Sequence, residues 1–245
     1  MSQRQSGIPF DPRGGLVVLI DPGRSSPEEA MALAARAADA GACGILLGDS
    51  LSGAPDVREH VAAVRAGAPH LGLVQFPATA DELSADVDAV LFLVLVSGRN
   101  ARYLIGEQLR AVSFFDAHPE IPAISTAYVL IDGGQVSSVE RVTRTQPLSA
   151  DDPEVIATHV KAGRLMGMHT TYLEAGSGAA RPVSTSVIAL AREATDGPLI
   201  VGGGITTADA ARDARSAGAN YVVVGTLFER DPLAAIQTLA AAARA

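Results

Sequence analysis

The feature that most constrains the fold is a regular alternation of short apolar runs with alanine-rich stretches of helical periodicity. Each apolar run is continuous, which is typical of strands in a parallel sheet whose outer face is covered by helices. Eight such runs with helical crossovers between them predict an α/β protein with the (β/α)₈ TIM barrel fold. The predicted strands are Leu16–Ile20, Gly44–Leu47, Leu71–Phe76, Ala89–Leu95, Ala127–Ile131, Thr170–Leu173, Leu199–Val201 and Tyr221–Val224.

Helix signals fill most of the intervals between these strands. Ser26 is a predicted N-cap, followed by Pro27 at the first helical position and two acids in the first turn. Between Phe76 and Asp88 only about a dozen residues remain, near the lower limit for a helical crossover, so we predict a short or missing third helix. The predicted helices are Pro27–Ala40, Asp56–Ala66, Arg102–Asp116, Asp151–Met166, Ser184–Ala194, Ala208–Ala217 and Leu233–Ala243.

Length and composition favour a single domain that covers residues 1–245. The net charge of −8 argues against a broad nucleic-acid footprint. The first apolar run is too short for a signal or membrane helix, so we expect a soluble, cytoplasmic protein. The lone Cys43 excludes an internal disulfide, and we expect it to be a small buried residue. The five histidines show no metal-ligand spacing.

The last three strands end in glycine-rich turns, where a barrel places its chemistry. Glycines let the backbone come close to a ligand and point N–H groups at an anion. We therefore predict a site for a small phosphorylated polyol, with amides on the phosphate and with Glu174 and Tyr172 on the hydroxyls. The residues assigned to this substrate site are Tyr172, Leu173, Glu174, Ala175, Gly176, Ser177, Gly178, Gly202, Gly203, Gly204, Gly225 and Thr226.

The early strands end in acids and hydroxyl residues, which suit a hard cation such as Mg²⁺. Asp21 follows the first strand and Gly48-Asp49-Ser50 follows the second. A phosphate half beside a metal half predicts a reaction that joins a phosphorylated alcohol to a diphosphate ester. Another turn, Asp132-Gly133-Gly134, comes after the fifth strand and predicts a small projecting hairpin.

Several motifs along nearly the whole barrel resemble those of the geranylgeranylglyceryl phosphate synthase family, prenyltransferases that make the first ether bond of archaeal lipids and have bacterial relatives. The octet Tyr172–Ala179 matches the family signature without a change. The other motifs are Ile20-Asp21-Pro22, Gly48 with Ser50, Phe76-Pro77, Tyr103–Gln108, Tyr128-Val129 and Val201–Ile205.

The resemblance implies a Mg²⁺-dependent prenyltransferase that joins sn-glycerol 1-phosphate to a prenyl diphosphate, such as geranylgeranyl diphosphate, and releases diphosphate. It implies that Asp21 and Ser50 bind Mg²⁺, and that Tyr172 and Glu174 bind the glycerol hydroxyls, with Glu174 as the base. It also implies a prenyl groove beside the missing third helix, a homo-oligomer (dimer or hexamer), and transient membrane-surface contact for the lipid product. The implied phosphate site comprises Ser177, Gly203, Gly204, Gly225 and Thr226.

The chain departs from the family pattern on the donor side of the site. Asp49 stands where the family has glycine before the Ser50 position, and Ala78 stands where glycine is common. Ser97-Gly98 lacks the family's usual run, and Ala127 replaces a glycine. We hypothesise that Asp49 supplies a second carboxylate to the cation and makes donor binding more strictly dependent on Mg²⁺.

Three alternatives stay open at this point. One is prenyl transfer to another phosphorylated three-carbon acceptor such as phosphoglycerate, although Glu174 would repel its carboxylate. Another is a phosphosugar isomerase that uses Asp21 and Asp132 as an acid–base pair. The third is a catalytically weak barrel that binds phosphorylated ligands. Phe92 and Phe114-Phe115 could line a lipid groove, but their pattern favours ordinary core.

Overall fold

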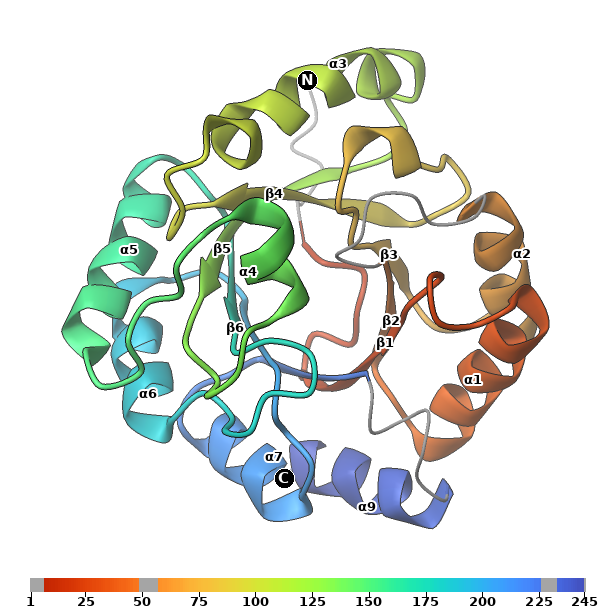
Figure 1. Ribbon diagram of the computed structural model, residues 1–245. Coiled ribbons are helices and arrows are strands. Elements are labelled where there is room, and N and C mark those ends of the chain that lie inside the picture. Colours follow the sequence, from red (N-terminus) through yellow and green to blue (C-terminus); the bar gives the residue numbers. More distant parts are fainter. Residues whose placement is uncertain (1–6, 49–56, 226–232, 245) are drawn as a thin grey trace.

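Eight parallel strands form a closed barrel in the order β1 to β8, and β8 pairs with β1 (Figure 1). The computed structural model describes residues 7–48, 57–225 and 233–244. The predicted (β/α)₈ barrel is confirmed. The strands are β1 (Gly15–Ile20), β2 (Gly44–Leu47), β3 (Leu73–Gln75), β4 (Ala89–Leu95), β5 (Ala123–Leu130), β6 (Thr170–Glu174), β7 (Leu199–Gly202) and β8 (Tyr221–Val224).

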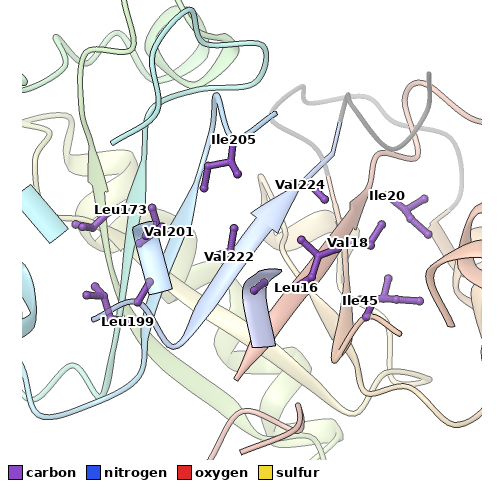
Figure 2. Close-up of a cluster of buried hydrophobic side chains, with 14 of the residues drawn as sticks. Leu16, Val18, Ile20, Ile45, Leu173, Leu199, Val201, Ile205, Val222 and Val224 are labelled. Atoms are coloured by element: carbon purple, nitrogen blue, oxygen red, sulfur yellow. The ribbon is translucent and has the colours of Figure 1, made fainter. Parts of the chain in front are cut away.

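The strands are buried on both faces because alternate residues serve two separate cores. Val17 and its inward-facing counterparts on other strands fill the barrel interior. Leu16, Val18 and Ile20 belong to the cluster outside the barrel (Figure 2). The helix residues Ala30 and Ala34 pack in the same cluster. Burial on both faces explains why the strands read as continuous apolar runs.

Apart from the short helix α4, the helices form an outer ring around the barrel (Figure 1). Ser26 caps α1 as predicted: its side chain accepts the Glu29 N–H at 3.3 Å, and its own N–H donates to the Glu29 carboxylate at 2.7 Å. These paired contacts satisfy amide groups that the first turn leaves without helical partners. The helices are α1 (Pro27–Ala40), α2 (Val57–Gly67), α3 (Glu107–Ala117), α4 (Ser138–Thr143), α5 (Pro153–Leu165), α6 (Thr185–Ala194), α7 (Ala208–Ser216) and α9 (Leu233–Arg244).

The third crossover holds only a short 3₁₀ turn, η1 (Ala80–Glu82), which confirms the predicted gap in the outer ring. The next crossover begins with a π-helical turn, η2 (Arg102–Gly106), and continues as α3. The predicted helix Arg102–Asp116 therefore has the right position, but its first turn is wider than an α-helix. Within the described residues, no helix is long and apolar enough to cross a membrane.

Two predictions about the region around β5 are wrong. The Asp132-Gly133-Gly134 turn does not open a hairpin, because the Asp132 carboxylate accepts the Gly134 N–H at 2.8 Å and turns the chain toward α4. In Figure 1, α4 lies inside the ring of helices, over the strand ends. β5 also begins at Ala123, four residues earlier than predicted, because Ala123–Thr126 pairs with β4.

The amino-terminal end of the barrel is closed by residues that precede β1. Phe10 is buried and lies so close to Gly44 that a side chain there would overlap its ring. Its ring also meets Tyr221 edge to face at 5.4 Å. Cys43 is buried as predicted, and burial raises the pKa of its thiol to about 12. The packing at this end leaves the carboxyl ends of the strands as the place for a site.

Candidate active site

A cavity of about 260 Å³ lies at the carboxyl ends of the strands, over β6, β7 and β8. Many of the predicted substrate residues line it. Leu173 and Ala175 do not line the cavity. Their side chains belong to the core between the barrel and the helices. The predicted residues that line the cavity are Tyr172, Glu174, Ser177, Gly178, Gly203, Gly204 and Gly225.

Glu174 is the last residue of β6 and is buried. The Gly176 N–H donates to Oε1 of its carboxylate at 2.6 Å, which fixes the side chain toward the cavity. Burial raises the pKa of Glu174 to about 7, although the hydrogen bond from Gly176 and the nearby Tyr172 hydroxyl oppose the rise. A carboxyl group with this pKa can take up a proton near neutral pH.

Tyr172 lies two residues earlier and therefore points to the same side of β6 as Glu174. Its side chain is fully buried, and burial raises its pKa well above the ordinary value. Among the described residues its hydroxyl has no hydrogen-bond partner of ordinary geometry, although it is close enough to Glu174 to lower that carboxyl's pKa. A buried hydroxyl without a full partner is rare, and here it borders the cavity.

Gly202 allows the phenol and the carboxylate to converge. A Cβ at this position would lie 2.7 Å from the Tyr172 hydroxyl and 3.0 Å from Glu174 Oε2. Both polar groups therefore reach over the end of β7 at a point where any side chain would block them. The sequence-based assignment of Gly202 to the substrate site stays a prediction. The structure adds that this glycine makes room for the two side chains.

Glycines with left-handed backbone form the walls beside this pair. Gly203 has φ of 86° and Gly204 has φ of 70°, values that residues with side chains rarely adopt. A Cβ on Gly203 would lie 2.7 Å from the Gly176 nitrogen and 2.8 Å from Glu174 Oε1. The turn after β7, which contains Gly203, therefore contacts the turn after β6, which contains Gly176. The Gly176 N–H is used to bind the Glu174 carboxylate.

Gly225 closes the cavity on the β8 side and differs from the other glycines. Its φ is not in the left-handed region, and a Cβ there would lie 3.6 Å from Leu19, an ordinary contact. The predicted residues Thr226, Ser50 and Asp49 lie outside the described residues. Their assignments stay predictions.

The proposed metal half contains Asp21, which directly follows β1 and is half-buried. Its carboxylate accepts the Gly23 N–H at 2.8 Å and pairs with the Arg24 guanidinium at 3.2 Å. Burial raises the pKa of Asp21 despite the opposing effects of Gly23 and Arg24. Within the described parts of the chain, no three His, Cys, Asp or Glu residues gather in a metal-binding group.

This environment fits a Mg²⁺ ligand. Each carboxylate oxygen can accept more than one contact, so Asp21 keeps acceptor capacity beyond Gly23 and Arg24. Mg²⁺ is commonly held by one or two carboxylates together with waters and substrate phosphates, so a large acidic cluster is not needed. A nearby cation would also offset the cost of burying this carboxylate.

An apolar cleft of about 100 Å³ adjoins the polar cavity and lies between η1, β4 and the η2–α3 segment. Phe92 and Phe115 line it, with their rings 5.6 Å apart, whereas Phe114 does not. Phe115 also packs against the core between the barrel and the helices, so this residue belongs to the core and lines the cleft as well. The cleft lies beside the gap left by the missing third helix, where the resemblance placed a prenyl groove.

Three aromatic rings stand where the two cavities meet. Phe76 and Tyr128 line both cavities, and Tyr172 lines the polar one. The ring centroids lie 5.4 Å apart for Phe76 and Tyr172, 5.4 Å for Tyr128 and Tyr172, and 5.7 Å for Phe76 and Tyr128. The sequence analysis named Phe76 and Tyr128 as parts of family motifs, without assigning either to the substrate site. Phe76 directly follows β3 and Tyr128 lies on β5, and both belong to the cluster inside the barrel, which makes them part of the site.

The alternative acid–base pair is not assembled. Asp132 is exposed, and its carboxylate is engaged by Gly134 and lies 3.8 Å from Arg181. Neither Asp132 nor Asp21 belongs to the described lining of the polar cavity. This arrangement argues against an isomerase that uses these two acids.

The fold and the site together define a class: a (β/α)₈ barrel whose glycine-walled polar cavity, with a buried glutamate, opens onto an apolar cleft. The chain belongs to the PcrB family, whose profile matches residues 12–243. The family resemblance read from the motifs is confirmed.

Named relatives span nearly the whole chain. The geranylgeranylglyceryl phosphate synthase of Spirosoma linguale is 37% identical, with 90% of this chain and 88% of the relative covered. That of Korarchaeum cryptofilum is 35% identical, with coverage of 91% and 92%. The crystal structure of (S)-3-O-geranylgeranylglyceryl phosphate synthase from Thermoplasma acidophilum in complex with sn-glycerol-1-phosphate matches with a TM-score of 0.87 and 31% identity, over 94% of this chain and 93% of that one.

Proposed function

We propose that the protein is a prenyltransferase that forms an ether bond between sn-glycerol 1-phosphate and a prenyl diphosphate, such as geranylgeranyl diphosphate, and releases diphosphate. The relatives from Spirosoma and Korarchaeum are named geranylgeranylglyceryl phosphate synthases. The synthase from Thermoplasma acidophilum was solved in complex with its substrate sn-glycerol-1-phosphate. The observation that carries the proposal in this chain is Glu174, a buried carboxyl group with a pKa of about 7 that lines the polar cavity. This cavity shares Phe76 and Tyr128 with the apolar cleft.

The acceptor occupies the polar cavity in this proposal. Its hydroxyls contact Glu174 and the Tyr172 phenol, whose hydroxyl otherwise lacks a full partner among the described residues. Its phosphate faces the backbone of Gly203 and Gly204, with Ser177 and Gly225 on the same cavity wall. Backbone N–H groups in glycine turns suit an anion because they offer several donors without side-chain bulk.

The reacting carbon of the donor lies at the junction of Phe76, Tyr128 and Tyr172. The acceptor oxygen forms the new bond to C1 while the bond from C1 to the diphosphate oxygen breaks, and the electron pair leaves with diphosphate. Glu174 takes the hydroxyl proton as attack proceeds. Positive charge that develops at C1 faces aromatic rings, which attract cations, and the apolar walls exclude water that would otherwise give a free prenyl alcohol.

Mg²⁺ would be held by Asp21 and, by the family resemblance, Ser50. When bound, it would neutralise charge on the leaving diphosphate. The supporting observation is the position of the Asp21 carboxylate, which directly follows β1 and keeps acceptor capacity beyond its contacts with Gly23 and Arg24.

Assembly and location belong to the same proposal. We expect a homo-oligomer, either a dimer or a hexamer, in the cytoplasm, with transient membrane-surface contact for the lipid product. Large apolar side chains are exposed on η2 and α3, which supports an apolar contact of this surface with a second subunit or with a membrane surface. They are Ile105, Leu109 and Val112.

The test is an incubation of the protein with Mg²⁺, sn-glycerol 1-phosphate and a series of prenyl diphosphates, with products identified by mass. We expect an ether-linked prenylglyceryl phosphate that requires both substrates. A parallel incubation with 3-phosphoglycerate should give far less product because Glu174 repels a second carboxylate. Absence of ether product with every donor would contradict the proposal.

A further inference from the structure

The apolar cleft is narrow in the arrangement described. Its volume is about 100 Å³, whereas sites for organic ligands commonly measure roughly 300–1,000 Å³. One wall comes from the segment around η1, including Thr79, Ala80 and Leu83. The opposite wall comes from η2 and α3. The separation of these two walls therefore determines how much of a donor chain the cleft can hold.

Glu107, the first residue of α3, ties the two walls together. Its carboxylate accepts the Ala80 N–H at 2.9 Å and thereby holds the start of η1. It also pairs with Arg102 at 2.5 Å and with Arg110 at 3.2 Å. Arg110 reaches back to Asp81 of η1. We call these five residues, Ala80, Asp81, Arg102, Glu107 and Arg110, the Glu107 clamp.

The π-helical turn makes the clamp possible. Arg102 and Glu107 are five residues apart, a spacing that places side chains on different faces of a regular α-helix. In η2 the Glu107 N–H bonds to the Arg102 carbonyl oxygen, which is the π-helical pattern. This wider turn brings the fifth residue back over the first, so the two charged groups meet.

Glu107 dominates the clamp because it is its buried member. Its side chain is 11% exposed, whereas that of Asp81 is 73% exposed. An exposed ion pair contributes little stability, but a buried charge whose partner is removed is strongly destabilising. Burial alone would raise the pKa of Glu107, but Ala80, Arg102 and Arg110 together hold it below its ordinary value.

We propose that Glu107 is a positioning residue for the prenyl donor: by holding η1 against α3 it sets the width of the apolar cleft, and with it the prenyl chain length that the enzyme prefers. This inference rests on the proposed function. The contact of Glu107 with a main-chain N–H of the opposite wall carries it, because neutralising or removing this one side chain loosens that wall without touching the polar cavity.

Glu107→Gln tests the proposal, since it keeps the shape and removes the charge. Because the charged acceptor that holds the Ala80 N–H is lost, the ratio of kcat/KM for a long donor to that for a short one should rise about tenfold or more. The acceptor KM should stay within about twofold. Hydrogen exchange of the Ala80 amide should become faster. Asp81→Asn should change the donor ratio much less, because its ion pair is exposed.

Asp196→Asn is the matched control. It breaks the exposed Arg164–Asp196 ion pair, whose residues line neither cavity, and should leave the donor ratio unchanged. If Glu107→Gln does not fold, Arg110→Gln removes the second arm of the clamp and should give a smaller shift in the same direction. An unchanged donor ratio in a folded variant, or equal changes in the KM of donor and acceptor, would overturn the proposal.

Calorimetric binding of two unreactive probes, farnesol and geranylgeraniol, separates this inference from the proposed function. If wild-type protein gives no ether product, the proposed function fails. The clamp proposal is then judged by the binding ratio of the two alcohols. We expect Glu107→Gln to favour geranylgeraniol more than wild type does, and an unchanged ratio would refute the role of Glu107.

Discussion

The polar cavity and the apolar cleft are built in opposite ways. The polar cavity lies at the carboxyl ends of β6, β7 and β8. Its backbone is packed so closely that a Cβ on Gly203 would collide with the Gly176 backbone and the Glu174 carboxylate. The apolar cleft is closed by a 3₁₀ turn and a π-helical turn that charged side chains hold together. The comparison teaches that the proposed acceptor half is held by tightly packed backbone, whereas side-chain contacts hold the walls of the proposed donor half.

The largest effect should come from Glu174→Gln, which tests the proposed acceptor half. The carboxamide keeps the shape but cannot act as a base, so turnover should fall by about 10²-fold or more. Steady-state kinetics with both substrates saturating measures it, and circular dichroism checks the fold. Glu193→Gln, at an exposed position on α6, is the matched control and should keep its turnover. Near-normal turnover of the Glu174 variant would place the base elsewhere.

The raised pKa of Glu174 also predicts a stability change with pH. The pKa of Glu174 is about 7 in the folded state, against an ordinary value of 4.5. Between these two pH values the folded protein therefore keeps a proton on Glu174 that the unfolded chain has lost. This group therefore favours folding at pH below about 4.5, and that contribution is lost as pH rises to about 7. The loss should amount to roughly 3 kcal/mol at 1.36 kcal/mol per pKa unit.

Denaturant unfolding of wild type and Glu174→Gln across this pH range measures the difference. The difference in unfolding free energy should shift in favour of the variant as pH rises, because the amide does not ionise. Parallel pH curves for the two proteins would show that Glu174 is not held in a desolvated state.

Gly225→Ala should have a smaller and more selective effect. The added methyl group meets Leu19 at 3.6 Å without backbone strain, so the fold should be kept while the polar cavity becomes narrower. We expect the acceptor KM to rise about tenfold, equivalent to roughly 1.4 kcal/mol, with little change in the donor KM. Equal rises for both substrates would mean that Gly225 does not border the acceptor alone.

Gly203→Ala sharpens the comparison with Gly225→Ala. The Gly203 backbone has φ of 86°, and a Cβ there would crowd Gly176 and Glu174. We therefore expect lost stability as well as lost activity at Gly203. A substitution at this position cannot by itself separate phosphate binding from packing, whereas Gly225→Ala can.

The smallest effect concerns the proposed donor half. Gly106, in the π-helical turn, has φ of −65°, and a Cβ there would find its nearest neighbour at 3.6 Å. Gly106→Ala should raise the free energy of unfolding by roughly 0.4–1 kcal/mol, because it restricts the unfolded chain. Denaturant unfolding measures this gain. A loss of stability would indicate that the π-helical turn needs glycine.

The fold was predictable from the sequence because burial leaves a clear pattern in each strand. Continuous apolar runs predicted the barrel, and the short interval after Phe76 predicted the gap that η1 now occupies. The hairpin at Asp132 was wrong because the same Asp-Gly-Gly turn can be satisfied locally by the aspartate side chain. A local turn signal does not determine whether a strand or a helix comes after the turn.

Site residues could be predicted where they lie in one motif, but not where the site is formed by several elements. Tyr172 and Glu174 were predicted because both lie at the end of one strand. The aromatic junction needs the inward positions of Phe76 and Tyr128, which are known only once the strand register is fixed. The Arg102–Glu107 pair has a π-helical spacing that a search for α-helical periodicity passes over.

The most direct test of the central claim is the pH dependence of prenyl transfer in a single turnover, with both substrates bound. If Glu174 takes the acceptor proton, the wild-type rate should rise with pH and level off above an apparent pKa near 7. The residual rate of Glu174→Gln should lack this step. A wild-type rate that does not change between about pH 5.5 and 8.5, or the same step retained in Glu174→Gln, would contradict the account.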